Sequence, residues 1–209
     1  MNPELSPEVL LQAYSTGIFP MASPEMNDLI LWYAPDPRGI IPLDNFHMSR
    51  SLKKVIKSKK FAILSDTNFE AVVRECAIKR GSSDETWISE EIIDSYTQLH
   101  RLGFAHSVEC YEDGKLVGGL YGVCIKGAFF GESMFHKSRD ASKVAICALV
   151  ESMKRHGFAL LDTQYTTAHL ISLGAIDIPK VEYDALLNEA IQLENAWWNA
   201  DFSWFKDFF

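Results

Sequence analysis

The chain has 209 residues, of which 47% are apolar and 12% aromatic, enough for one large domain or two small ones with a sizeable core. This composition excludes an intrinsically disordered, collagen-like or coiled-coil protein, and no apolar run approaches the roughly 18 residues that a membrane-spanning helix needs. The formal net charge of −8 counts against a protein that simply coats nucleic acid, although it leaves room for a local basic patch.

Residues 1–85 are predicted to form a small α+β unit. A helix is expected at 6–17, because Ser6 can cap it, Pro7 suits its first turn and Gly17 ends it. A basic helix is predicted at 49–60, after a segment rich in prolines and aromatic residues. The remaining elements predicted in this unit are strands at 29–33 and 61–64 and a helix at 68–79.

From residue 86 to residue 196 the pattern indicates a larger, sheet-forming unit. Its predicted elements are a helix at 89–102, strands at 104–111, 115–125 and 128–135, a helix at 138–156, a strand at 158–162, a helix at 166–173, a strand at 175–178 and a helix at 179–193. Three antiparallel strands, a long helix and a further strand predict an α+β fold with an acyltransferase-type sheet. The aromatic tail at 197–209 is expected either to pack back on this unit or to form a contact between molecules.

One stretch, residues 50–60, holds six basic residues and no acid. Arg50, Lys53, Lys54 and Lys57 recur at helical spacing and therefore share one face of the predicted helix. Such a stripe is either an ordinary solvated helix face or a contact for the phosphate backbone of a nucleic acid.

Two acids interrupt apolar strands. Glu132 is expected to share one face of its strand with Phe130 and Met134, and Asp162 is expected to project with Gln164 at the end of another strand. A carboxylate in apolar surroundings is costly unless it is paired or hydrogen-bonded. These polar groups therefore either cap helices and pair with arginines, or form a site for a cationic or amine substrate, whose nitrogen they would orient.

Other chemistry has less support. Ser133 follows Gly131, but Phe135 stands where a nucleophile elbow needs glycine, so no serine nucleophile is expected. The six histidines lack H-E-x-x-H spacing and the four cysteines lack C-x-x-C spacing, so no metal or other cofactor is expected. Residues 1–6 show no secretory signal, which makes a reducing cytoplasm the expected compartment.

Short motifs spread along the chain in a constant order resemble the leucyl/phenylalanyl-tRNA–protein transferase family. They are YSTGIFP (14–20), WYAPDPR (32–38), TWI (86–88), LHRLGFAHSVE (99–109), LVGGLYG (116–122), GESMF (131–135), ASK (141–143), D-x-Q (162–164) and H-x-x-SLGA (169–175). The resemblance implies a GNAT-like acyltransferase domain at 86–196, preceded by the small α+β N-terminal domain. It also implies an enzyme that moves Leu or Phe from aminoacyl-tRNA to proteins with N-terminal Arg or Lys, which marks them for N-end rule degradation. A monomer is expected, although the sequence does not fix the oligomeric state.

By this resemblance the catalytic residues are Asp162, Gln164 and Glu132. Asp162 is expected to orient Gln164, and Gln164 to hold the attacking α-amino group. Glu132 is expected to bind the basic acceptor side chain or to position the ester. The donor side chain is expected to occupy an apolar pocket formed by Leu120, Met134, Ile146, Leu149, Met153 and Leu161.

The same resemblance assigns the RNA contacts. Trp87 and Trp32 are candidates to stack on the terminal adenine, because unpaired bases stack on aromatic rings. The stripe of Arg50, Lys53, Lys54 and Lys57 is expected to contact the tRNA backbone. For the apolar pocket and both tryptophans, ordinary core packing is the alternative interpretation.

Two other functions stay open at this stage. A coenzyme A-dependent N-acetyltransferase would need a glycine-containing pyrophosphate loop before the long helix, and residues 136–141 contain no glycine. A non-catalytic binder of basic N-termini would use Glu132 and Asp162 for recognition alone. Transfer of leucine from charged tRNA to a peptide that begins with Arg distinguishes the three.

Overall fold

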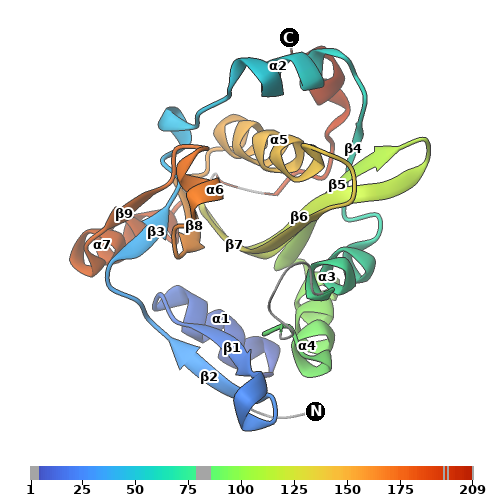
Figure 1. Cartoon of the computed structure of the whole chain (residues 1–209). Helices are drawn as coiled ribbons and strands as arrows, with labels where there is room; N and C mark the ends of the chain where they lie inside the picture. Colours follow the sequence, from blue (N-terminus) through green and yellow to red (C-terminus); the bar gives the residue numbers. More distant parts are fainter. Residues whose placement is uncertain (1–4, 79–85, 195, 197, 209) are drawn as a thin grey trace.

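A mixed seven-stranded sheet forms the centre of the molecule, with helices on both faces (Figure 1). The computed structural model describes residues 5–78, 86–194, 196 and 198–208. In sheet order the strands are β4 (Ala62–Ser65), β5 (Ala105–Glu112), β6 (Lys115–Ile125), β7 (Ala128–His136), β8 (Leu160–Gln164), β3 (Arg38–Ile40) and β9 (Ile176–Ile178). The predicted α+β class is confirmed.

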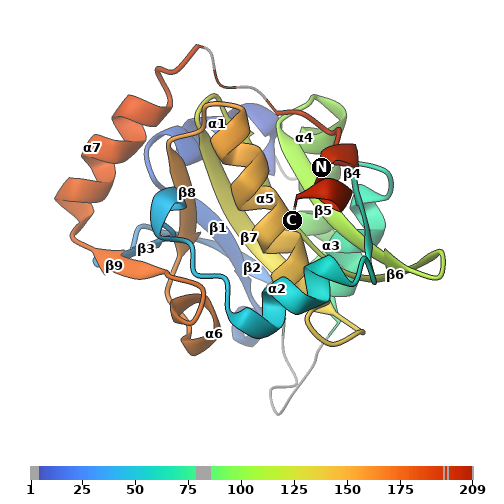
Figure 2. The same ribbon diagram turned by 90° about the horizontal axis from the view of Figure 1, so that it is seen from above.

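Helices cover the sheet on both sides. Figures 1 and 2 show α5 along one face, while α1, α3 and α4 lie on the other. The helices are α1 (Pro7–Ser15), α2 (Arg50–Lys57), α3 (Phe69–Ala77), α4 (Glu90–Arg101), α5 (Ala141–Arg155), α6 (Ala168–Ile171) and α7 (Lys180–Ala190). Each predicted helix is present, with ends shifted by a few residues. None of those built from the described residues has the length and apolar character that a membrane crossing requires.

Two short strands were not predicted, β1 (Phe19–Ser23) and β3. β1 pairs with β2 (Leu29–Tyr33) in a separate two-stranded ribbon, and β3 lies between β8 and β9 in the main sheet. Because β3 and β4 both precede residue 85, the expected N-terminal domain contributes two strands to the sheet that the later residues build.

The sheet separates two hydrophobic cores. On one face α4 presents Ile92, Tyr96 and Leu99, whose spacing of three and four residues forms one apolar helix stripe. On the other face α5 is buried along almost its whole length. A helix that is apolar around most of its circumference needs cover on several sides, and α2 and residues 198–208 contribute to this second core.

A β-bulge at Glu132 changes the direction of β7. The register of β6 and β7 shifts between Tyr121 and Gly122, which leaves Glu132 as the extra residue of β7. Phe130 therefore packs in the core beside α1 and α4, whereas Met134 packs in the core beside α5. The expectation that Phe130, Glu132 and Met134 share one face is wrong, because the bulge shifts the alternation after Glu132.

The neighbouring strands β7 and β8 are parallel, but they pair over only a short length. Residues 128–130 of β7 face residues 160–162 of β8, and the ladder stops there. β7 continues to His136 and β8 to Gln164 without further pairing to each other. The sheet thus opens between these two strands.

The aromatic tail packs back on the molecule. The indole Nε1 of Trp198 donates a hydrogen bond of 2.8 Å to Asp66, and its ring stacks on His106 with a centroid distance of 4.5 Å. Phe202 and Phe205 are buried in the α5 core, and Figure 2 shows the C-terminal segment beside α2 and α5. The tail thereby supports the underside of α2, since Phe202, Phe205 and the α2 residue Ile56 line a common small cavity.

Candidate functional site

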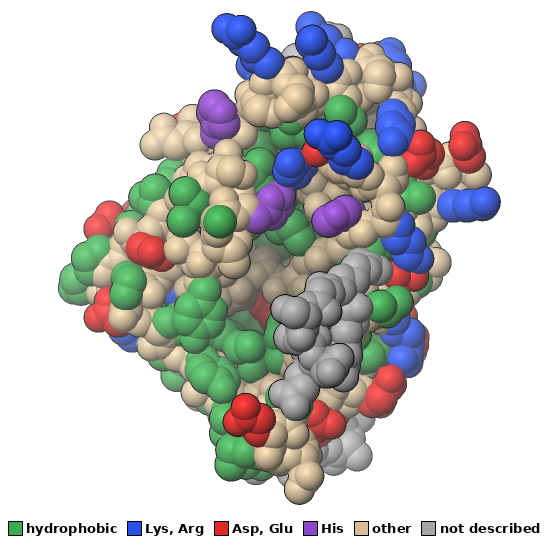
Figure 3. Space-filling view, viewed as in Figure 1, with side chains coloured by type: hydrophobic (Ala, Val, Ile, Leu, Met, Phe, Trp, Pro, Cys, Tyr) green, Lys and Arg blue, Asp and Glu red, His purple; other side chains and the backbone are tan. Residues whose placement is uncertain are grey.

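A pocket of about 230 Å³ lies where β7 and β8 diverge, at the hollow near the centre of the face in Figure 3. Its lining is mostly apolar and includes five of the six residues that were expected to hold the donor side chain. These five are Leu120, Met134, Ile146, Leu149 and Leu161. The sixth, Met153, is buried in the α5 core and is not among the lining residues.

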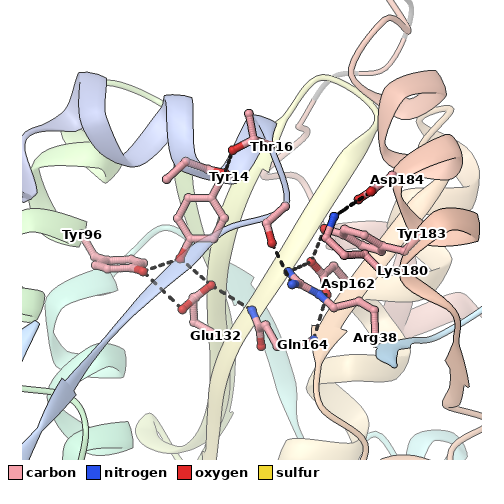
Figure 4. A network of polar contacts seen from close by, with 12 residues as sticks. Tyr14, Thr16, Arg38, Tyr96, Glu132, Asp162, Gln164, Lys180, Tyr183 and Asp184 are labelled. Atoms are coloured by element: carbon pink, nitrogen blue, oxygen red, sulfur yellow. Dashed lines mark hydrogen bonds and ion pairs between the residues drawn. The ribbon is translucent and has the colours of Figure 1, made fainter. Parts of the chain in front are cut away.

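Glu132 lines this pocket and is held by hydroxyl and amide donors (Figure 4). Its Oε1 accepts hydrogen bonds from Tyr14 Oη at 2.7 Å and from Gln164 Nε2 at 3.1 Å. Its Oε2 accepts one from Tyr96 Oη at 3.3 Å, and the two tyrosine hydroxyls also contact each other. The bulge in β7 places the carboxylate where these donors from α1, α4 and β8 converge.

The surroundings of Glu132 favour its neutral form. Burial raises the pKa of Glu132 from 4.5 to about 8, and the charge of Asp162 adds to this, while the hydrogen bonds from Tyr14 and Tyr96 oppose it. Burial likewise raises the pKa of Tyr14 and Tyr96 well above 10, so both stay hydroxyl donors. A cation that entered the pocket would favour the ionised carboxylate.

Asp162 has a different environment, because an arginine faces it. The guanidinium of Arg38 donates to both carboxylate oxygens, through Nε at 2.9 Å and Nη2 at 2.6 Å, and Tyr183 Oη donates at 2.7 Å. Arg38 also donates to the carbonyl oxygen of Gly17 at 2.8 Å. Burial by itself would lower the pKa of Arg38, but the hydrogen bonds and charge of Asp162 outweigh it and raise that pKa.

Gln164 connects the two carboxylates. Its backbone N–H donates to Asp162 Oδ1 at 2.8 Å, and its side-chain Nε2 donates to Glu132. The backbone of Gln164 has a positive φ of 58°, an uncommon conformation for a residue with a side chain. Asp162 therefore acts on the backbone of Gln164, and its own carboxylate is not among the pocket-lining groups. The three residues expected to act together are thus linked in one network.

The predicted RNA-contacting residues are not among the residues that line this pocket. Trp87 is half-buried against the α1-side core, and Trp32 is exposed on β2. Neither is among the residues that line the pocket, and their stacking role stays a prediction. Leu52 and Ile56 are buried and anchor α2, whereas its cationic side chains are exposed. These cations are Arg50, Lys53, Lys54 and Lys57.

A separate cluster of Asp66, His100 and His106 has metal-type spacing, but protein groups already occupy its donors and acceptors. His106 Nδ1 contacts Asp66 Oδ2 at 2.9 Å, and its Nε2 contacts the carbonyl oxygen of Gly103 at 3.1 Å. Asp66 also accepts the Trp198 indole. The cluster therefore anchors the C-terminal tail.

Sequence reasoning missed four site residues, Tyr14, Tyr96, Arg38 and Tyr183. Weak signals existed for two of them. Arg38 precedes the apolar run of residues 39–41, where a buried arginine needs an acid, and Tyr96 falls on the apolar stripe of its helix. The sequence gives no such signal for Tyr14 and Tyr183, because a tyrosine at an apolar helix position is as typical of core packing as of a functional site.

Comparisons with known families give a consistent result. The family model described as "Leucyl/phenylalanyl-tRNA protein transferase" matches residues 40–188, and the model described as the N-terminal domain of the same family matches residues 3–36. Both matches include parts of the pocket network, since Tyr14 lies within residues 3–36 and Glu132, Asp162 and Gln164 lie within residues 40–188.

Individual relatives extend over nearly the full chain. A leucyl/phenylalanyl-tRNA–protein transferase of Rhodospirillum rubrum is 49% identical over 189 residues, which cover 90% of this chain and 89% of the relative. A protein of the same name from Herpetosiphon aurantiacus is 52% identical over 193 residues, 92% of this chain and 97% of the relative. The solved structure of L-PGS from Bacillus licheniformis covers 79% of this chain and 55% of its own at 12% identity and a TM-score of 0.44, a likeness too remote to carry an argument.

Proposed function

The chain belongs to the leucyl/phenylalanyl-tRNA–protein transferase family and is an aminoacyltransferase, and we propose that it moves Leu or Phe from aminoacyl-tRNA to the N-terminal Arg or Lys of acceptor proteins. One observation carries this proposal: the apolar pocket between β7 and β8 has Glu132 and Gln164 in its wall. An apolar side chain and a cationic amine can therefore be held next to each other.

The proposed chemistry follows from these groups. The α-amino group of the acceptor attacks the ester carbonyl of the aminoacyl-tRNA, the new amide bond forms and the terminal ribose hydroxyl leaves. An amide is more stable than an ester, so placement of the two reactants is the main requirement. Because Gln164 Nε2 donates to Glu132, its carbonyl oxygen Oε1 is the group left to accept a hydrogen bond from the attacking amine.

Glu132 and Asp162 divide the remaining tasks in this proposal. Glu132 binds the positive charge of the acceptor, which shifts its carboxyl toward the ionised form. Asp162 is a positioning residue that holds the backbone of Gln164 and is itself held by Arg38 and Tyr183. Met134 lets the apolar pocket adapt to either Leu or Phe, since its unbranched side chain repacks readily.

Further properties belong to the same proposal. Residues 86–196 form a GNAT-like catalytic domain, supported by three antiparallel strands, a long helix and a further strand in that order. Residues 1–85 form the N-terminal domain, and the protein works as a cytoplasmic monomer whose products enter N-end rule degradation. Trp87, Trp32 and the cations of α2 contact the tRNA.

The test is transfer of leucine from charged leucyl-tRNA to a peptide that begins with Arg. Mass spectrometry should show a peptide heavier by one leucine residue, and the same peptide with N-terminal Ala should stay unchanged. A product that forms from acetyl coenzyme A instead, or peptide binding without any transfer, would refute the proposal in favour of an acetyltransferase or a simple binder.

A further inference from the structure

A second cavity, of about 670 Å³, adjoins the pocket at the start of α5. Met134 and His169 line both cavities, so the two are neighbours. The other lining residues are all polar or charged, and they are His136, Lys137, Arg139, Asp140, Ser142 and Lys143. The apolar pocket thus adjoins a cavity whose lining is polar and charged.

The lining of this second cavity is positively charged. Lys137, Arg139 and Lys143 face a single lining acid, Asp140, in a chain whose net charge is −8. Asp140 is shared, since Lys143 Nζ lies 3.3 Å and Arg139 Nε 3.6 Å from its carboxylate. Lys137 pairs with Glu75 outside the lining. The three cations share two acids, so an anion in the cavity would meet an excess of positive charge.

The positive charge around this cavity also affects the imidazole of His169. Burial lowers the pKa of His169, and the positive charge of Lys143 and the proximity of His136 lower it further. α5 also begins at this cavity, and the positive end of the dipole of this 15-residue helix favours negative charge there. Side-chain charge and helix orientation therefore favour the same kind of ligand.

The cavity lies beside the basic stretch of residues 50–60. Lys60 Nζ donates to Ser138 Oγ at 2.9 Å, which joins the end of that stretch to the loop before α5. Figure 3 shows Lys, Arg and His side chains gathered between α2 and the central hollow. The positive surface therefore runs from α2 to the rim of the apolar pocket.

We propose that the second cavity binds the phosphodiester nearest the aminoacyl ester, the one on the 5′ side of the terminal nucleotide of aminoacyl-tRNA. The inference rests on the proposed function and extends it to a new site. A donor whose amino acid occupies the apolar pocket has its terminal ribose at the mouth of that pocket, and this ribose carries the phosphate. Lys143 and Arg139 would contact the phosphate, and His169 would stand between it and the amino acid.

The test combines one chemical and one protein change. Leucyl-tRNA is prepared with its last phosphodiester replaced by an uncharged methylphosphonate, and transfer to a peptide that begins with Arg is compared with that from normal leucyl-tRNA. The methylphosphonate should lower kcat/KM of the unaltered enzyme about tenfold, the effect of losing a hydrogen bond to a charged group. Lys143→Met should lower transfer from normal leucyl-tRNA similarly, and it should show little further loss with the methylphosphonate.

Two more variants complete the design. Lys143→Arg keeps the charge and should keep most of the sensitivity to the methylphosphonate. Lys115→Met removes an exposed lysine at the start of β6, outside both cavities, and should behave as the unaltered enzyme.

The outcomes separate the two proposals. If the unaltered enzyme uses both donors equally well, or if the effects of Lys143→Met and the methylphosphonate simply multiply, the phosphate is not bound in this cavity, although aminoacyl transfer stands. If normal leucyl-tRNA gives no transfer, the proposed function itself fails.

Discussion

The two carboxylates of the network differ because only one of them faces an arginine. Asp162 accepts two hydrogen bonds from the Arg38 guanidinium and is fully buried. Glu132 accepts hydrogen bonds only from neutral groups, and it lines the pocket. The buried pair acts as structural support, and the unpaired carboxyl is available for a cationic ligand.

Variants at Asp162 and Gln164 should therefore fail for different reasons. Asp162→Ala leaves the Arg38 guanidinium buried without its partner, which should lower the free energy of unfolding by about 3–5 kcal/mol. Gln164→Asn shortens the side chain by one methylene, and asparagine tolerates the positive φ, so the fold should keep its stability to within about 1 kcal/mol while transfer is lost. Urea denaturation beside the transfer assay checks both, and equal stability of the two variants would contradict the supporting role of Asp162.

Glu132 should make stability depend on pH. Its pKa is about 8 in the folded protein and near 4.5 when unfolded, so between these values the folded state holds a proton that the unfolded state has released. Stability contributed by this group is then lost as pH rises from about 4.5 to about 8. In Glu132→Gln that loss should be smaller by about 2 kcal/mol, less than the full shift implies because water in the pocket screens the charge.

Urea denaturation at the two pH values measures this difference. Glu182→Gln on the exposed side of α7 is the matched control and should keep the pH dependence of the unaltered protein. An equal loss of stability in Glu132→Gln and in the unaltered protein would show that Glu132 ionises freely.

At the scale of elements, α2 combines a buried apolar side with an exposed cationic one. Charge reversal on the exposed side should leave its packing intact, because Leu52 and Ile56 carry the contacts with the core. Lys53→Glu with Lys57→Glu should raise KM for aminoacyl-tRNA and reduce the dependence of binding on salt, since fewer counterions are released. Lys115→Glu with Lys126→Glu, at the hairpin ends of β6, is the control. A salt dependence unchanged by the α2 variant would contradict the contact.

Elements with a long regular pattern were predictable, and so were some short ones such as β4 and β9, but β1 and β3 were not. α1, α4, α5 and the hairpins of β5, β6 and β7 carry clear periodicity or turn residues. β3 has three residues and follows two prolines, so its place in the sheet depends on β8 and β9, which lie more than a hundred residues later. The bulge at Glu132 was also invisible, because it is a mismatch between two strands and neither strand shows it alone.

The site residues that could be predicted are those whose sequence pattern is distinctive. Glu132, Asp162 and Gln164 stood out because polar groups interrupt apolar strands, and five of the six expected pocket residues line the pocket. Met153 could not be separated from its neighbours on α5, because helical spacing does not say how far along a helix a cavity extends. Arg38 and the tyrosines reach the site only through tertiary folding.

At the scale of the whole molecule, strands from before and after residue 85 share one sheet. Unfolding is therefore expected to be cooperative, with circular dichroism and tryptophan fluorescence giving the same midpoint in urea. An N-terminal unit that folds independently would instead give two midpoints, because Trp32 and Trp198 lie in different parts of the chain. That result would contradict a single cooperative unit.

The short pairing between β7 and β8 has a practical consequence for enzyme engineering. The space proposed for the donor side chain is created by diverging main chains and not by a row of small side chains. Trimming Met134 or Leu161 would therefore enlarge an existing chamber without removing the frame around it. Such a scaffold is a suitable starting point for attaching non-natural amino acids to the N-terminus of a polypeptide.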